Sequence, residues 1–271
     1  MIGSIVRELR SSHHFLLATH VNPDGDAIGS LGALALVLEK MGKHVVAYCQ
    51  DEVPGFLQFL PYSDRIVQHI PKPEQFDAAV VLDCGELDRI GTAAGVLRHV
   101  RKIIHIDHHS CGDGFGELRL VRPACSSTAE ILYEIFQNIP VEIDLDTAEN
   151  MYTAIFTDTG SFRFANTTAQ ALAIAAEMVS LGVEPAKVAS AVYDSMSPAR
   201  LRLLALSLNT LTVRANQRLA AMWVSQQMFR ETGTESADTD GFVNYPRAID
   251  GAEMAIFFRE MDSGKVNVSL R

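Results

Sequence analysis

Residues 15–42 read FLLATHVNPDGDAIGSLGALALVLEKMG, an apolar run followed by a polar turn and a second, longer apolar run. The first run, Phe15–Thr19, is short and aliphatic, as a strand buried on both faces of a parallel sheet would be. The second, Asp26–Met41, is apolar on a helical period and stops at Gly42, where glycine commonly ends a helix. The segment therefore predicts a strand, a turn and a helix, the repeating unit of an α/β domain.

Further apolar runs of strand length follow in the first half of the chain, at His44–Cys49, Ala78–Leu82 and Lys102–Ile106. Strands that alternate with helical patterns in this way favour a parallel sheet flanked by helices. Such sheets gather functional groups at the carboxyl ends of their strands. The predicted fold class is α/β, and the polar residues that follow each run are the first candidates for a site.

The second half of the chain is mostly helical up to about residue 195 and then changes character. Helices are predicted over Ser126–Phe136, Leu145–Phe156, Thr168–Leu181 and Pro185–Tyr193. Beyond them we expect a connecting helix at Arg200–Leu211, a loop at Glu231–Gly241, and strands at Leu219–Val224, Ala252–Arg259 and Lys265–Leu270. The pattern predicts two domains, a large α/β domain at residues 1–195 and a smaller α+β domain at residues 196–271.

The composition is that of a folded chain with an acidic balance. Hydrophobic residues make up 48% of the 271 residues, and the net charge is −10. A protein that holds long nucleic acid by its phosphates usually carries a basic surface, so long duplex nucleic acid is disfavoured as a partner. Small phosphorylated substrates stay open, because bound divalent cations can reverse the local field.

Compartment can be read from the cysteines and from the apolar stretches. The four cysteines are scattered without a C-x-x-C pair, and the chain starts without a secretory pattern. Both features indicate a reducing, cytoplasmic compartment. The longest apolar stretch, Ala27 to Leu38, is too short to cross a bilayer. We expect a soluble cytoplasmic protein with no membrane partner.

The turn after the first strand places His20, Asp24 and Asp26 within seven residues. A carboxylate at a helix start can simply cap the helix, and capping explains one aspartate without any ligand. It does not explain the pair together with a histidine at the strand end. One imidazole and two carboxylates form the mixed donor set that suits Mn²⁺, Mg²⁺ or Zn²⁺. A metal site is the favoured interpretation of this turn.

Two more polar groups come directly after or at the end of predicted strands. Asp83, in Asp-Cys-Gly, lies where open α/β sheets build their sites, although an aspartate that caps the next turn is an equal alternative. Residues 105–110 read HIDHHS, and strand alternation points His105 and Asp107 to the same side. Packing does not explain a histidine-rich cluster that leaves a buried strand. Imidazoles serve instead as transition-metal ligands or general acids.

The last candidate, Asp158, opens the sequence Asp-Thr-Gly just after a predicted helix. A carboxylate at this end of a helix is poorly placed with respect to the helix dipole. Another partner is therefore expected for Asp158, and a cation would be one.

Taken together, the motifs H-x-N-P-D-x-D (residues 20–26), D-C-G (83–85), D-H-H (107–109) and D-T-G (158–160) resemble those of the DHH phosphoesterase superfamily. That superfamily includes RecJ exonucleases, family II inorganic pyrophosphatases, cyclic-dinucleotide phosphodiesterases and bifunctional oligoribonuclease/pAp phosphatases. The sequences CSSTAE at 125–130 and GFVNYP at 241–246 most closely resemble the last branch.

The resemblance implies a centre of two divalent cations, with Mn²⁺ expected and Mg²⁺ or Co²⁺ as alternatives. It assigns His20 and Asp24 to one metal, and Asp26, His108 and Asp158 to the other. Asp83 would bridge the two, since a carboxylate has an oxygen for each cation and an imidazole can offer only one nitrogen. Asp107 is expected to orient its neighbours, and His109 to meet the scissile phosphate. The catalytic residues implied are thus His109 and Asp83.

For the second domain the resemblance implies a DHH-associated, substrate-binding domain at residues 196–271. The glycine-rich G-G-G-H segment of that branch is absent from this sequence. The chain stops within a predicted strand, so the C-terminal part of this domain is expected to be missing. Arg163, Asn244, Arg259 and Arg271 are the candidate substrate contacts.

The function implied is hydrolysis of short single-stranded oligoribonucleotides, of 3′-phosphoadenosine 5′-phosphate (pAp), or of both. A homodimer is compatible with it. The alternatives are another DHH hydrolase, such as a cyclic-dinucleotide phosphodiesterase or a pyrophosphatase-like enzyme, and a non-catalytic nucleotide-binding relative. A family II pyrophosphatase is disfavoured because its basic C-terminal segment is not found here.

Overall fold

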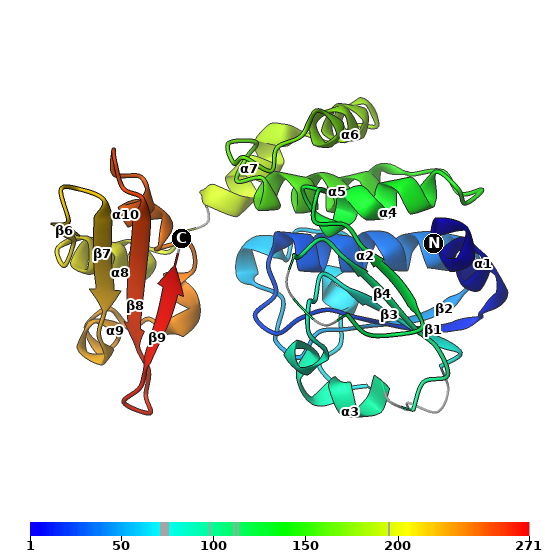
Figure 1. Cartoon of the computed structure of the whole chain (residues 1–271), viewed down its shortest axis with the longest axis horizontal. Coiled ribbons are helices and arrows are strands. Elements are labelled where there is room, and N and C mark those ends of the chain that lie inside the picture. Colours follow the sequence, from blue (N-terminus) through cyan, green and yellow to red (C-terminus); the bar gives the residue numbers. More distant parts are fainter. Residues whose placement is uncertain (71–75, 98, 111, 113, 195, 271) are drawn as a thin grey trace. The chain divides into compact units, whose positions relative to one another are not determined.

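The computed structural model describes residues 1–70, 76–97, 99–110, 112, 114–194 and 196–270. The chain divides into two compact units, Met1–Tyr193 and Asp194–Arg271 (Figure 1). Arg271, one of the four candidate substrate contacts, lies outside the described residues. Each unit has its own sheet and its own core.

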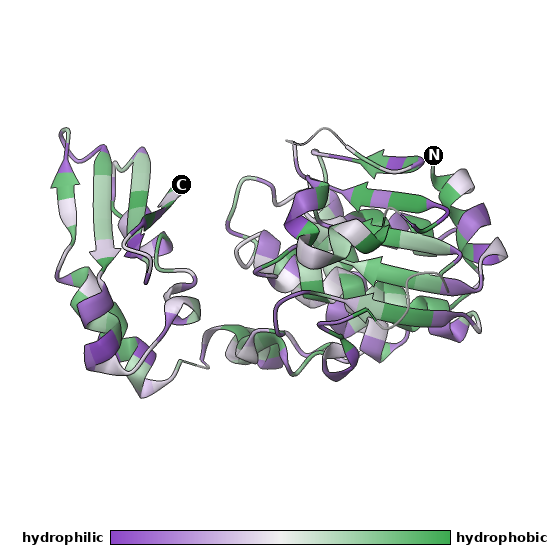
Figure 2. Cartoon of the chain, turned by 90° about the horizontal axis from the view of Figure 1, so that it is seen from below, coloured by the Kyte–Doolittle hydropathy of each residue, from purple (hydrophilic) through white to green (hydrophobic). Residues whose placement is uncertain are grey.

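The first unit is built on a five-stranded parallel sheet of order β2-β1-β3-β4-β5. Its strands are β1 (His14–Ala18), β2 (His44–Tyr48), β3 (Ala78–Leu82), β4 (Ile103–Asp107) and β5 (Leu118–Val121). Apolar side chains alternate between two cores, with Phe15 and Leu17 on one face of the sheet and Leu16 and Ala18 on the other. Burial on both faces explains why the central strands β1 and β3 are almost entirely apolar (Figure 2).

Most helices of this unit lie over one face of the sheet (Figure 1). They are α1 (Ile2–Ser11), α2 (Gly25–Lys40), α4 (Thr128–Phe136), α5 (Leu145–Asp158), α6 (Ala169–Ser180) and α7 (Pro185–Tyr193). The other face is covered by α3 (Ala94–Leu97) and by a 3-10 helix, Leu87–Ala93. This parallel sheet with flanking helices confirms the predicted α/β fold class.

The close approach of α2 and α5 depends on small residues. A Cβ atom at Gly29 would lie 2.5 Å from the Asn150 carbonyl oxygen and 3.0 Å from the Ala154 Cβ. One at Gly25 would lie 2.2 Å from the Thr157 hydroxyl. The glycines therefore let the two helices meet directly above the sheet.

The second unit holds a four-stranded mixed sheet of order β6-β7-β8-β9. Its elements are β6 (Thr212–Arg214), β7 (Leu219–Val224), β8 (Met254–Glu260) and β9 (Val266–Leu270), with α8 (Pro198–Leu208), α9 (Gln226–Thr232) and α10 (Asn244–Arg247). Its core is formed by residues such as Leu203, Met222, Phe242 and Phe257. The predicted second, smaller α+β domain is therefore present.

The structure corrects several details of the sequence interpretation. The predicted loop at Glu231–Gly241 is wrong: α9 extends to Thr232, and Ser236–Thr239 form a 3-10 helix. The Asp238 carboxylate stabilises that helix by accepting a hydrogen bond from the Glu235 N–H at 2.9 Å. Sequence analysis does not predict α1, α3, α9, α10, β5 or β6, and the ends of the predicted helices and strands shift by a few residues. Among the described residues, no helix combines the length and apolar character needed to cross a bilayer.

We expect Gly29→Ala to destabilise the protein by about 1–3 kcal/mol, because the added methyl group overpacks the contact between α2 and α5. Gly3→Ala in α1 is the matched control, since nothing lies within 4 Å of a Cβ atom at that position. The control should be neutral or more stable by up to about 1 kcal/mol. Urea denaturation measures both changes. Equal stability of the two variants would contradict the assigned contact.

Candidate metal centre

The four predicted motifs converge at the carboxyl edge of the sheet in the first unit. His20 follows β1, Asp83 follows β3 directly, and Asp107 is the last residue of β4. Asp158 is the last residue of α5, which packs over α2. Parallel strands place their carboxyl ends at one edge, and therefore bring together residues that are far apart in sequence.

Asp83 lies at the middle of this cluster. Its side chain is almost fully buried, and its backbone adopts a left-handed conformation with φ of +53°. One carboxylate oxygen, Oδ2, is 3.5 Å from the His20 Nε2 atom. The other, Oδ1, is 3.5 Å from the His108 Nε2 atom. The two oxygens of a single carboxylate therefore face two different imidazoles, and the strained backbone is of the kind found at functional sites.

The two imidazoles are oriented by backbone carbonyl groups. The His20 Nδ1 atom is 2.9 Å from the Val21 carbonyl oxygen, and the His108 Nδ1 atom is 3.4 Å from that of Cys125. Because a carbonyl oxygen can only accept, each Nδ1 atom acts as the donor in this contact, and Nε2 is the nitrogen that faces Asp83. The Arg89 Nη2 atom also lies 3.4 Å from the His20 Nδ1 atom. A hydrogen bond at the outer nitrogen is the usual way in which a protein orients a metal-ligating histidine.

The remaining carboxylates surround this core. Asp24 caps α2, with its Oδ1 atom accepting hydrogen bonds from the N–H groups of Asp26 and Ala27. The capping alternative thus holds for Asp24, but it uses only one oxygen. Ligand atoms of His20, Asp24 and Asp83 lie within 4.8 Å of one another. On the other side, the His108 Nε2 atom is 3.7 Å from Asp26 Oδ2 and 3.6 Å from Asp158 Oδ2.

Burial makes a negative charge on Asp26 or Asp83 unfavourable unless a positive group compensates it. It raises the pKa of Asp26, and it raises the pKa of Asp83 well above the usual range, with the charge of Asp26 as the next cause. A divalent cation between the side chains would remove this cost. The oxygen and imidazole donors also suit Mn²⁺ or Mg²⁺. The residues present therefore fit a metal centre.

Asp107 and His109 form a separate pair at the edge of the cluster. The Asp107 Oδ1 atom accepts hydrogen bonds from the backbone N–H groups of His108 and His109, and from the His109 Nδ1–H at 2.7 Å. Burial alone would raise the pKa of Asp107, but its contacts with His105 and His109 outweigh burial and lower it. The hydrogen bond to Asp107 in turn raises the pKa of His109 to about 9. His109 therefore favours the imidazolium form, with a proton left on Nε2.

His109 can also be grouped with Asp83 and His108, because ligand atoms of the three lie within 4.8 Å of one another. The His109 Nδ1 atom is 3.5 Å from Asp83 Oδ1 but only 2.7 Å from Asp107 Oδ1. A nitrogen that donates to a carboxylate has no lone pair for a cation. The geometry thus separates His109 from the histidines whose Nε2 atoms face Asp83.

Sequence analysis missed several residues that support the cluster. The Asp26 carboxylate accepts hydrogen bonds from the Thr128 N–H at 2.6 Å, the Ala129 N–H at 3.2 Å and the Ser30 hydroxyl at 2.9 Å. The amide of Asn166 donates to Asp158 Oδ2 at 3.3 Å. The only available signal was the CSSTAE sequence at 125–130, which marked a family branch and carried no assigned role.

The candidate substrate contacts are more scattered. Arg163 is exposed, and its Nε atom donates to the Gly160 carbonyl oxygen at 2.7 Å. In the second unit, Asn244 opens α10. The Arg259 Nη1 atom donates to the Ser236 carbonyl oxygen and the Thr239 hydroxyl, at 3.0 and 3.2 Å. Arg259 thus holds the 3-10 helix of its own unit.

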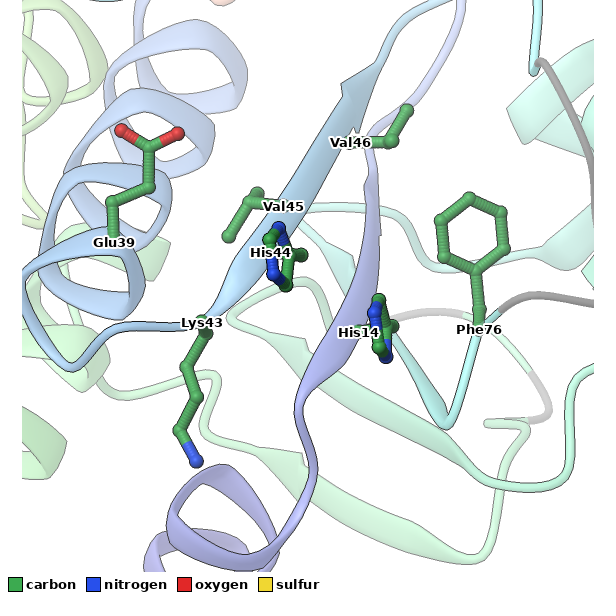
Figure 3. A pocket seen from close by; sticks show the side chains of 7 residues that line it. All are labelled: His14, Glu39, Lys43, His44, Val45, Val46 and Phe76. Atoms are coloured by element: carbon green, nitrogen blue, oxygen red, sulfur yellow. The ribbon is translucent and has the colours of Figure 1, made fainter.

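A cavity of about 510 Å³ lies at the amino ends of β1 and β2, at the end of the sheet opposite the carboxylate cluster (Figure 3). His14 and His44, which open β1 and β2, stack there with ring centroids 5.0 Å apart. Lys43 and Phe76 also line it. These side chains stand at the amino ends of the strands, whereas the carboxylate cluster follows their carboxyl ends. The cavity therefore contributes nothing to the candidate metal centre.

Comparisons with known proteins agree with the four motifs. Residues 14–155 match the DHH family, N-terminal domain. The chain is 34% identical over 255 residues to the bifunctional oligoribonuclease and PAP phosphatase NrnA of Thermus thermophilus, covering 94% of this chain and 75% of that protein. The protein of the same name from Bacillus subtilis is 24% identical over 265 residues, which are 97% of this chain and 82% of the relative.

A similar structure is also known. The crystal structure of an exopolyphosphatase-related protein from Bacteroides fragilis superposes with a TM-score of 0.93 at 27% identity. The similarity covers 100% of this chain and 82% of that one.

In the absence of divalent cations, Asp83→Asn should stabilise the protein by about 0.5–2 kcal/mol, because a neutral amide relieves the repulsion between buried carboxylates. Adding Mn²⁺ should then raise the melting temperature of the wild type and leave that of the variant nearly unchanged. Thermal unfolding in chelator and in Mn²⁺ measures both effects. Asp262→Asn, at an exposed position of the second unit, is the control and should behave as the wild type. A variant that is less stable than the wild type in chelator would contradict the repulsion argument.

Proposed function

Because the chain belongs to the DHH family, as its four motifs predicted, and is a phosphoric-ester hydrolase, we propose that it uses two divalent cations to hydrolyse short oligoribonucleotides and pAp. Mn²⁺ is the cation we expect. The observation that carries the proposal is the position of Asp83, whose two carboxylate oxygens each lie 3.5 Å from a different histidine Nε2 atom. A bridging ligand needs this arrangement.

In this proposal the ligands form two sets, one for each cation, and Asp83 belongs to both. His20 and Asp24 would hold one cation with it, and Asp26, His108 and Asp158 would hold the other. The distances of 3.5–3.7 Å from the His108 Nε2 atom to the carboxylates of Asp26, Asp158 and the shared Asp83 support this division. Two donor atoms that share a cation at about 2.1 Å lie no more than about 4.2 Å apart, so these separations are compatible with a common ion.

Two cations at these positions would neutralise charge on the phosphoryl oxygens and lower the pKa of the attacking water. The protein's own contribution to proton transfer falls to His109. Asp107 holds the His109 Nδ1–H, so the proton on Nε2 can be offered to the scissile phosphate or to the leaving oxygen. Asp107 thereby acts as a positioning residue through His109.

The substrate class rests on the relatives and on charge. Both relatives described above are named for activity on oligoribonucleotides and PAP. A net charge of −10 favours short phosphorylated substrates over long nucleic acid. Residues 196–271 would then serve as the substrate-binding domain, with Asn244, Arg259 and Arg271, together with Arg163 of the first domain, as candidate contacts.

The proposal also places the protein in the cytoplasm and allows it to form a homodimer. Cys49, Cys84 and Cys125 are free thiols, which fits the reducing cytoplasm. All proposed ligands come from one chain, so a homodimer is compatible with the centre and is not required for it.

We expect His109→Ala to lower kcat by a factor of about 10²–10⁴, since it removes the proton donor without removing a ligand. The Mn²⁺ content of the variant should stay at the wild-type value, which distinguishes a proton donor from a metal ligand. Steady-state kinetics and elemental analysis provide the two readouts. His14→Ala, at the far edge of the sheet, should change neither. A loss of bound Mn²⁺ in His109→Ala would assign this histidine to the metal instead.

The substrate class can be tested by turnover in Mn²⁺ on a panel of pAp, a two-to-five-nucleotide RNA, pyrophosphate and a cyclic dinucleotide. We expect the first two to be hydrolysed, and the Asp83→Ala variant to be inactive on all four while it remains folded. Hydrolysis of pyrophosphate alone, or of the cyclic dinucleotide alone, would overturn the proposed substrates. Near-normal turnover by Asp83→Ala would overturn the bridging role.

A further inference from the structure

The turn that opens α4 contacts several of the proposed ligands. The Cys125 carbonyl oxygen accepts from His108 Nδ1 at 3.4 Å. The Thr128 N–H donates to Asp26 at 2.6 Å, and the Thr128 hydroxyl donates to Asp83 Oδ1 at 3.2 Å. One short segment thus contacts proposed ligands from the first turn of α2, from the end of β3 and from the residues after β4.

Asp158 is connected to the same turn through Asn166. The Asn166 amide nitrogen donates to Asp158 Oδ2 at 3.3 Å and to the Asp158 carbonyl oxygen at 3.2 Å. It also lies 3.1 Å from the carbonyl oxygen of Ser126, which is part of the turn. A single side chain therefore ties the carboxyl end of α5 to the amino end of α4.

The turn itself is fixed from within. The Glu130 Oε2 atom accepts hydrogen bonds from both the backbone N–H and the hydroxyl of Ser126, each at 2.7 Å. Ser127 caps α4, with its hydroxyl oxygen accepting from the Glu130 N–H at 3.3 Å. The three side chains are buried. Hydrogen bonds in such a dry setting hold the backbone rigidly.

Asp158 needs this support more than the buried carboxylates of Asp26 and Asp83 do. Its side chain is 25% exposed, against 1% for Asp26 and 2% for Asp83. It also stands at the carboxyl end of α5, where the helix dipole repels a negative charge. The Asn166 amide supplies a donor to this partly exposed carboxylate.

We propose that Asn166 and Thr128 are the positioning residues of the centre, and that the turn at residues 125–130 sets the spacing between its ligands. Asn166 fixes Asp158, and Thr128 fixes the bridging carboxylate of Asp83. The inference rests on the metal centre of the proposed function. Neither side chain is a ligand, so each acts through the aspartate to which it donates.

Titration of metal-free protein with Mn²⁺ tests the proposal without reference to activity. The wild type should bind two equivalents. Asn166→Leu should lower the affinity for one of the two Mn²⁺ ions by a factor of about 10–100, the usual effect of losing a hydrogen bond to a metal ligand. The affinity for the other ion should not change. Electron paramagnetic resonance at one equivalent per site should then show isolated Mn²⁺ in the variant where the wild type shows a coupled pair.

Asn150→Leu is the matched control. Asn150 lies on α5, about two turns before Asp158. Like Asn166, it donates to two backbone carbonyl oxygens, those of Pro61 and Asp146, and its Oδ1 atom is buried without a partner among the described residues. This variant should lose stability and keep both Mn²⁺ affinities. If it weakens Mn²⁺ binding as much as Asn166→Leu does, the effect is a general loosening of the fold and the proposal is overturned.

Thr128→Val provides a second route that does not depend on the folding of Asn166→Leu. It keeps the size of the side chain and the backbone N–H to Asp26, and removes only the hydroxyl. Thr128→Val should lower the affinity for both Mn²⁺ ions, because both ions share Asp83 as a ligand. Thr128→Ser keeps the hydroxyl and should bind both ions as the wild type does. Unchanged binding in Thr128→Val and Asn166→Leu would overturn the positioning roles alone. A wild type that binds no Mn²⁺ would overturn the metal centre of the proposed function and this inference with it.

Discussion

Repulsion between the buried carboxylates of Asp26 and Asp83 is the constraint on which the arrangement of the first unit depends. Asp26 and Asp83 are buried within reach of the same histidine, and burial raises the pKa of both. A fold gains nothing by gathering like charges in this way unless something positive joins them. The backbone strain at Asp83 adds to the cost. The site is therefore maintained against folding stability, as expected where selection acts on chemistry.

The fold meets this constraint with backbone groups. N–H groups at the start of α4 point at Asp26, and those at the start of α2 point at Asp24. Carbonyl groups of Val21 and Cys125 fix the tautomers of the two histidines. Backbone donors and acceptors are held by the helices and strands themselves, so they orient the side chains with little loss of conformational freedom. Rigid secondary structure is thus converted into rigid placement of charge.

Much of the first unit could be predicted because its information is local. The runs that form β1, β2, β3 and β4 are continuous in sequence, and the rule that parallel strands end at one edge brought His20, Asp83 and the DHH motif together. The supporting contacts could not be predicted in that way. Thr128 is separated from Asp26 by 102 positions and from Asp83 by 45. No periodicity or motif spacing in the sequence connects such distant residues. They meet because α4 packs against the sheet and against α2. The short elements β5 and β6 were missed because four or fewer residues carry too weak a pattern.

The sequence HIDHH shows how one motif divides into distinct tasks. His105 shares a face of β4 with Asp107, as strand alternation predicts, but it is buried and stacks on Phe115 with ring centroids 4.1 Å apart. Its Nε2 atom is 3.0 Å from the Cys84 carbonyl oxygen and 3.6 Å from Asp107 Oδ2. His105 thus lies beside Asp107, and Asp107 in turn orients His109. His108 directs its Nε2 atom toward the carboxylates of Asp26, Asp83 and Asp158. Identical side chains acquire different roles because each is hydrogen-bonded to a different neighbour: His105 through Nε2 to the Cys84 carbonyl oxygen, His108 through Nδ1 to that of Cys125, and His109 through Nδ1 to the Asp107 carboxylate.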